Sequence, residues 1–107
     1  MASTGKRKTP SGCRVQLGEE LVIGAAGALH VRLGKALARP GPVVLDAAAV
    51  TRLDTAGLQL LHAFVRARNE SAGEWCWENV GAALREAATQ LGMQRVLELP
   101  DAVPANN

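Results

Sequence analysis

Residues Val43 to Leu61, which read VVLDAAAVTRLDTAGLQLL, decide the fold of this 107-residue chain. The consecutive apolar residues Val43 to Leu45 predict a strand that is buried on both faces. Asp46 ends that strand, and a connection of small residues leads to Leu53. Asp54 then opens a helix, because its carboxylate can accept hydrogen bonds from the free N–H groups of the first turn. The stretch therefore predicts a strand, a tight connection and a capped helix.

The start of this helix carries the chemistry of the stretch. Thr55 follows the cap and is expected to face solvent, beside N–H groups that no helical carbonyl can satisfy. Leu53 and Leu58 flank the cap at the spacing of a hydrophobic staple, so they take the inward positions. A helix start of this kind attracts negative charge through its dipole and its free donors. A phosphate on Thr55 would add about −1.5 to −2 charges to this surface.

The outer face of the same helix carries a polar stripe. Gln59, His62 and Arg66 recur at steps of three and four residues, and Asn69 continues the series. Thr55 lies one turn before Gln59 and joins the stripe. Two interpretations stay open: the stripe is a solvated helix face, or it is a strip on which a partner protein docks.

The flanking segments complete an alternating pattern of strands and helices. The predicted elements are strands at residues 13–17 and 21–23 joined as a hairpin at Gly18, a helix at 26–38, a helix from Asp54 to about Arg68, a strand at 74–78, a helix at 80–91 that Gly92 ends, and a short strand or turn at 96–99. This order predicts the α/β class, with a mixed or parallel sheet on which helices pack. We expect one face of the sheet to lack a full helix layer.

Length and composition predict one globular domain at residues 13–100, between a disordered tail at 1–12 and a frayed end at 101–107. Three of the twelve Lys and Arg residues lie in residues 1–12, which leaves nine against ten Asp and Glu and a net charge of −1. The domain therefore shows no basic bias towards nucleic acid. Trp75 and Trp77 alternate with Cys76 in a predicted strand, and we favour core positions for both rings over a stacking platform.

The two aspartates and the helix start resemble the core of the STAS domain (sulphate transporter and anti-sigma-factor antagonist). That pattern runs from an apolar strand through Asp and a short loop to an apolar residue and Asp-Ser/Thr-x-Gly-Leu. Asp46 and the run Asp54-Thr55-Ala56-Gly57-Leu58 match it here. The resemblance covers roughly residues 14–100. It implies a small mixed β-sheet packed with about three to four helices.

The resemblance implies a non-catalytic interaction module in bacterial signalling, either antagonist-like or chemotaxis-associated, that binds an anti-sigma factor or a kinase-like ATPase. In the antagonists a partner kinase phosphorylates the Ser at the position of Thr55, and this releases the partner. Threonine also resembles STAS proteins that bind constitutively, including the small subunit of phospholipid-transport ABC systems, which docks on an ATPase. A third alternative is a nucleotide-binding domain that holds a phosphate at the helix start. The predicted partner-binding residues are Asp46, Asp54, Thr55, Ala56, Gly57, Gln59, His62 and Arg66, with Thr55 as the phosphoacceptor.

Other classes of function lack their sequence signals. The chain has no phosphate-binding Gly-Lys-Ser/Thr loop, no Cys or His spacing for a metal and no nucleophile elbow, so we expect no enzyme and no cofactor. No apolar run approaches the ~20 residues of a membrane span, and the N-terminus lacks the apolar region of a secretory signal. We therefore expect a cytoplasmic protein without membrane insertion. The oligomeric state stays open.

Limited proteolysis tests the expected domain boundaries. Residues 1–12, MASTGKRKTPSG, have no apolar periodicity, so cleavage should begin there and leave a compact remainder from about residue 13. Mass spectrometry of a digestion time course gives the cleavage sites. Early cleavage inside residues 43–61 would contradict the predicted fold.

Overall fold

The computed structural model describes residues 13–100, so the tails expected at 1–12 and 101–107 lie outside the described part of the chain. The central sheet has three parallel strands in the order β2-β4-β6: β2 at Cys13–Gln16, β4 at Val43–Asp46 and β6 at Trp75–Glu78. Its register places Val15 beside Leu45 and Leu45 beside Trp77. The strand predicted at the centre of the sequence is therefore also the central strand of the sheet, and the α/β class is confirmed.

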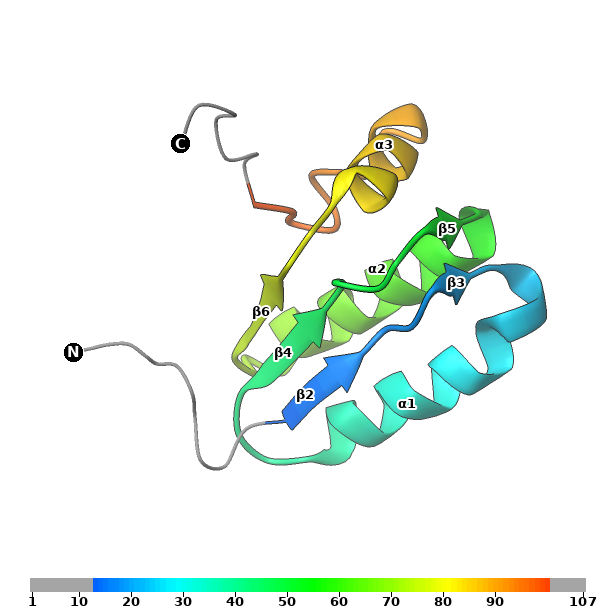
Figure 1. The fold of residues 1–107 in the computed structure, drawn as a ribbon. Helices are drawn as coiled ribbons and strands as arrows, with labels where there is room; N and C mark the ends of the chain where they lie inside the picture. The colour runs from blue at the N-terminus through cyan, green and yellow to red at the C-terminus, as the bar shows by residue number, and fades with distance from the viewer. Residues whose placement is uncertain (1–12, 101–107) are drawn as a thin grey trace.

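Helices cover one face of this sheet. Helix α1 (Ala26–Ala38) and helix α2 (Thr55–Glu70) run side by side along the sheet, and α3 (Ala82–Gln90) follows β6 (Figure 1). On the covered face Val15, Leu45 and Trp77 are buried, because alternate residues of a strand point to the same side. On the other face Arg14 and Cys76 are exposed. For the described residues 13–100, the expectation that one face lacks a full helix layer is confirmed.

Two short strands extend the architecture beyond the central sheet. Strands β3 (Glu20–Leu21) and β5 (Arg52–Leu53) pair in parallel and form a sheet of their own. The predicted hairpin at Gly18 is wrong, because β2 continues into β3 in the same direction and each strand pairs with a different partner (Figure 1). The strand predicted at residues 21–23 is also wrong in extent, since Ile23–Ala25 forms a turn of 3₁₀-helix, η1.

The helix boundaries follow the sequence pattern closely. Helix α1 has the predicted bounds, α2 runs two residues beyond Arg68, and α3 is shorter than the predicted 80–91. Gly92 adopts a φ of 67° just after α3, a left-handed conformation that glycine tolerates best at a helix end. Of the strand or turn predicted at residues 96–99, the structure has the turn, which covers residues 94–98.

The tryptophans of β6 join the sheet to the C-terminal turns. Trp77 is only 9% exposed, and its Nε1 donates to the Leu97 carbonyl oxygen at 2.8 Å. Trp75 is half-buried and donates from Nε1 to Oδ1 of Asn69 at 3.0 Å. The two rings meet edge to face, with centroids 6.0 Å apart. The predicted core position is confirmed for Trp77, whereas Trp75 lies at the boundary of the core.

Gly57 allows β3 to pack directly on the first turn of α2. A Cβ atom at Gly57 would lie 2.0 Å from the carbonyl oxygen of Leu21, so no other residue fits there without a shift of the backbone. The same carbonyl oxygen accepts a hydrogen bond from the N–H of Asp54 at 3.1 Å. Gly57 therefore sets the distance between the second sheet and the helix start.

A pair of glycine substitutions tests this close contact. Gly57→Ala should lower the free energy of unfolding by about 2–3 kcal/mol, because the added methyl group overpacks the contact with Leu21. Gly34→Ala is the control: a Cβ atom there meets nothing within 4 Å. That change should stabilise α1 by about 0.5–1 kcal/mol. Urea unfolding measures both, and equal stability of the two variants would contradict the packing of β3 on α2.

Candidate functional site

Asp54 lies at the centre of the candidate site, the first turn of α2. Its Oδ1 accepts from the N–H of Gly57 at 3.1 Å, which confirms the predicted helix cap. Its Oδ2 accepts from the N–H of Ile23 at 2.9 Å. The hydrogen bonds from Ile23 and then Gly57 favour the charged form and lower the pKa of Asp54. One carboxylate thus caps α2 and also holds η1 against it.

The Thr55 stripe, defined as Thr55, Gln59, His62 and Arg66, lies along the solvent side of α2. Thr55, Gln59 and Arg66 are exposed, and His62 is half-buried. Arg66 forms an ion pair with Glu70 at 3.5 Å, and both side chains are about 70% exposed. Such a pair contributes little to stability in water. The exposure predicted for Thr55 is confirmed, and the stripe is a surface that another protein can reach.

The remaining predicted contact residues are less accessible. Asp46 is 7% exposed and Gly57 is buried against β3, so both lie beneath the surface that a partner would touch. Ala56 is half-buried beside the helix start. The structure therefore brings Asp54, Thr55 and Ala56 together at one end of α2. Asp46 lies apart from them, at the end of β4.

Asp46 organises the uncovered face of the central sheet. Its Oδ2 pairs with Nη1 of Arg14 at 2.9 Å, and its Oδ1 accepts from Nδ2 of Asn79 at 3.1 Å and from the N–H of Ala48 at 3.0 Å. Arg14 also reaches Oε1 of Glu78 at 2.7 Å, so the network spans all three strands. Burial alone would raise the pKa of Asp46, but the hydrogen bonds from Asn79, Ala48 and Arg14 together lower it.

A shallow hollow of about 410 Å³, which we call the Ile23 groove, lies between η1, the start of α1 and the start of α2. Its lining residues are Ile23, Ala26, Gly27, His30, Ala56, Gln59 and Leu60. Ile23 is 73% exposed. Sequence reasoning missed Ile23, because its run with Leu21 and Val22 indicated a strand. The following Gly24 was the local signal that the strand ends there.

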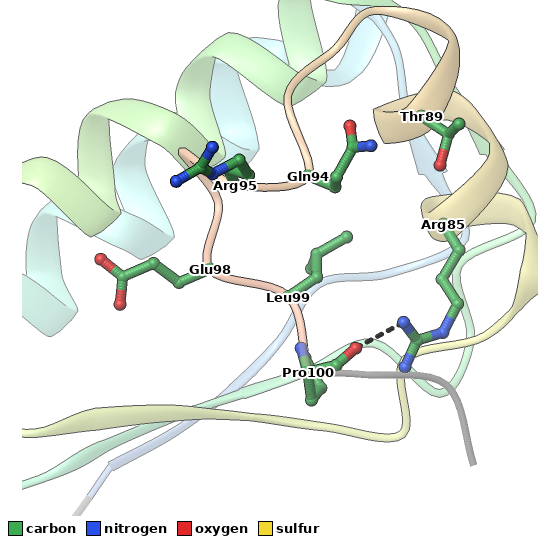
Figure 2. A pocket seen from close by; sticks show the side chains of 7 residues that line it. All are labelled: Arg85, Thr89, Gln94, Arg95, Glu98, Leu99 and Pro100. Carbon is green, nitrogen blue, oxygen red and sulfur yellow. Dashed lines mark hydrogen bonds between the residues drawn. The ribbon is translucent and has the colours of Figure 1, made fainter.

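A second hollow of about 490 Å³ lies beside α3 (Figure 2). Arg85 donates to the carbonyl oxygen of Pro100, and the guanidinium group of Arg95 points away from that of Arg85 (Figure 2). The two cations therefore do not converge on one point, as recognition of a single anion would require. Within residues 13–100, no group of three or more His, Cys, Asp or Glu side chains is placed to hold a metal ion.

Comparisons with known proteins agree with this geometry. The family model described as "Mlab, STAS domain" matches residues 4–99. A sulfate transporter family protein from Wolinella succinogenes superposes with a TM-score of 0.69 at 18% identity, over 86% of this chain and 75% of that one. The SulP transporter STAS domain from Vibrio cholerae gives a TM-score of 0.60 at 13% identity, over 85% and 71% of the two chains.

The anti-sigma factor antagonist SpoIIAA in its unphosphorylated form gives a TM-score of 0.61 at 18% identity, over 92% of this chain and 86% of that one. At these identities the structural likeness shows the fold alone. A search of curated protein sequences finds no match.

Acid should weaken the fold through the two aspartates. Their pKa values are lowered from the ordinary 3.8, so they contribute stability that is present above that pH and is lost as the pH falls through the folded pKa. Asp46→Asn should lower the free energy of unfolding at pH 7 by about 1–3 kcal/mol. The variant should then lose less stability than wild type between pH 7 and pH 3. Urea unfolding at both pH values tests this, and equal acid sensitivity would exclude a contribution from Asp46.

Proposed function

We propose a protein-binding role for this chain, which belongs to the STAS domain family. STAS domains are generally non-catalytic interaction modules. The observation that carries the proposal is the exposed side chain of Thr55 on the first turn of α2, in line with the accessible Thr55 stripe. Thr55, Gln59, His62 and Arg66 are the proposed contact residues, with Asp54 and Ala56 beside them.

Phosphorylation of Thr55 is the proposed switch. The first turn of a helix tolerates negative charge, because its dipole and its N–H groups favour anions. The same charge on a contact surface must be desolvated when the partner binds, and it repels acidic groups of the partner. Thr55 is exposed, so water and salt screen the repulsion between a phosphate there and the neighbouring Asp54 carboxylate. A phosphate on Thr55 would therefore change binding and leave the fold intact.

The proposed partner is an anti-sigma factor or a kinase-like ATPase in a cytoplasmic signalling pathway. The resemblance of the Asp54-Thr55-Ala56-Gly57 motif to the antagonists supports this choice, as does the shared fold of the antagonist SpoIIAA. Among residues 13–100, no helix is both long and apolar enough to cross a bilayer.

A subunit that docks on the ATPase of a phospholipid-transport ABC system is the second candidate function. Thr55 in place of Ser supports it, since a constitutive contact needs no phosphoacceptor serine. Gene neighbourhood separates the two candidates: kinase and regulator genes for the first, permease and ATPase genes for the second. The nucleotide-binding alternative is less favoured, because Asp54 already occupies the N–H of Gly57 that a phosphate would use.

Charge at Thr55 tests the proposed function. Thr55→Glu should change the free energy of unfolding by no more than about 0.5 kcal/mol, because the side chain is exposed. The same change should weaken binding to the partner ATPase that gene neighbourhood identifies by on the order of tenfold or more. Isothermal titration calorimetry and thermal melts measure the two effects.

The neutral variant Thr55→Gln is the matched control, and it should bind more tightly than Thr55→Glu because it adds similar bulk without charge. His62→Glu and Arg66→Glu should also reduce binding with little loss of stability. Unfolding of Thr55→Glu would mean that Thr55 is buried. Wild-type affinity in all these charge variants would place the interface elsewhere.

A further inference from the structure

A hollow of about 310 Å³, which we call the Trp75 hollow, lies between β6 and the C-terminal turns. Its lining residues are Trp75, Cys76, Trp77, Glu98 and Pro100. Asn69, near the end of α2, contacts two of them, Trp75 and Glu98. Thr55 begins the same helix, about 21 Å away along its axis. The Trp75 hollow is therefore separate from the surface to which the proposed function assigns a partner.

Hydrogen bonds hold an indole ring and a carboxylate side by side in this hollow. Nε1 of Trp75 donates to Oδ1 of Asn69 at 3.0 Å, and Nδ2 of Asn69 donates to Oε2 of Glu98 at 2.7 Å. The indole N–H can only donate and the carboxylate can only accept, so the two bonds require this orientation of the amide. Trp77 adds a second ring, whose plane lies at 79° to that of Trp75 with the centroids 6.0 Å apart.

Glu98 gives the Trp75 hollow a negative charge. Within residues 13–100, Glu98 has no Lys or Arg as an ion-pair partner. Its carboxylate points away from the guanidinium group of Arg85 (Figure 2). The backbone of Glu98 adopts a φ of 56°, a left-handed conformation that glycine would adopt with less strain. A charged side chain at such a position indicates a use for the carboxylate.

The chemistry of the lining selects an organic cation as the occupant. The faces of tryptophan rings carry negative charge density and attract cations, and the carboxylate of Glu98 attracts them too, whereas it repels anions. A metal ion needs several oxygen ligands, and the hollow offers a single carboxylate. A quaternary ammonium ion carries a positive charge inside a shell of methyl groups. It has no N–H group that needs an acceptor, and its methyl groups can contact the rings and Pro100.

We propose that the Trp75 hollow binds a small quaternary ammonium ion through the rings of Trp75 and Trp77 and the carboxylate of Glu98. A volume of about 310 Å³ lies within the range of small-molecule sites, so the proposed ligand is a free ion rather than part of a larger chain. Asn69 is a positioning residue, because it fixes Trp75 and Glu98 relative to each other. This inference goes beyond the proposed function and does not depend on it.

Intrinsic fluorescence of the full chain tests the proposal with choline as the probe. The sequence has two tryptophans, both in the hollow, and no tyrosine, so the emission reports this site directly. Choline chloride should change the emission saturably at millimolar concentration, and sodium chloride at equal ionic strength should not. The alcohol 3,3-dimethylbutan-1-ol has the shape of choline without the charge and should bind on the order of tenfold more weakly. Equal binding of choline and the alcohol would overturn the proposal.

Variants of the lining residues locate the binding site. Glu98→Gln removes the charge and keeps an acceptor for Asn69, and Trp75→Leu keeps apolar bulk without an aromatic face. Each should weaken choline binding by on the order of tenfold. Glu74→Gln is the matched control, because Glu74 is an exposed glutamate next to Trp75 that does not line the hollow. The control should bind like wild type. Trp77 remains as the fluorescent probe in all three variants, and thermal melts show whether each is folded.

The remaining outcomes decide against the proposal. Wild-type affinity in Glu98→Gln or in folded Trp75→Leu would overturn it, as would a loss of affinity in Glu74→Gln equal to that in Glu98→Gln. The absence of a saturable response in the wild-type protein would overturn it as well. If Trp75→Leu does not fold, Glu98→Gln and the neutral alcohol still give the answer. Thr55→Glu should leave choline binding unchanged, so the result at this hollow is independent of the result for the proposed function.

Discussion

The carboxylate of Asp54 is the interaction on which the candidate site depends. It accepts from Gly57 inside α2 and from Ile23 in η1, thirty-one residues earlier in the chain. The backbone of β3 lies against the same turn, because Gly57 has no side chain to keep Leu21 away. The exposed residues Thr55 and Ile23 therefore stand on a junction whose geometry is set by hydrogen bonds and close packing. A surface of this kind can contact a partner without the entropic cost of ordering loops on binding.

The two aspartates of the family motif have different structural roles. Asp54 caps α2. Asp46 is buried at the end of β4 and accepts hydrogen bonds from Arg14, from Asn79 and from the N–H of Ala48. Asn79 adopts a φ of 61°, a left-handed conformation that Asn tolerates better than most residues. A buried carboxylate is stable only when its hydrogen bonds compensate for lost hydration. Asp46 meets that condition and, through Arg14 and Glu78, connects three strands on the face that no helix of residues 13–100 covers.

The position of Thr55 suits regulation by charge. It follows the cap at the end of α2 where negative charge is tolerated, and it is exposed and does not belong to the hydrophobic core. The core beneath is formed by Leu58, Leu61 and their neighbours, which face the sheet. Because Thr55 faces solvent whereas Leu58 and Leu61 are buried, a modification of Thr55 is separated from the packing that stabilises the fold. This separation is the physical basis of the proposed switch, in which phosphate on Thr55 changes binding alone.

Local sequence determined much of this protein: the buried strand at Val43, the cap at Asp54, the bounds of α1 and the exposure of Thr55. Each depends on residues within one or two turns, so propensity and periodicity suffice to predict it. Tertiary structure decided the rest. Leu21 and Ile23 indicated one strand, but β3 ends at Leu21, which is buried against Gly57, and Ile23 lies in η1, where it is exposed.

Contacts between distant segments likewise decided which polar residues hold the fold together through hydrogen bonds. Arg68 was predicted only as the end of a helix, yet it is buried and donates to the carbonyl oxygens of Gly41 and Glu74 at 3.0 and 2.8 Å. Arg14 and Asn79 gave no local signal of their pairing with Asp46, because their partner lies more than thirty residues away. Hydrogen bonds and packing between distant segments appear in no short window of sequence. The sequence by itself therefore determined the central strand, the main helices and the motif, and only the tertiary structure decided which polar residues are buried and which remain on the surface.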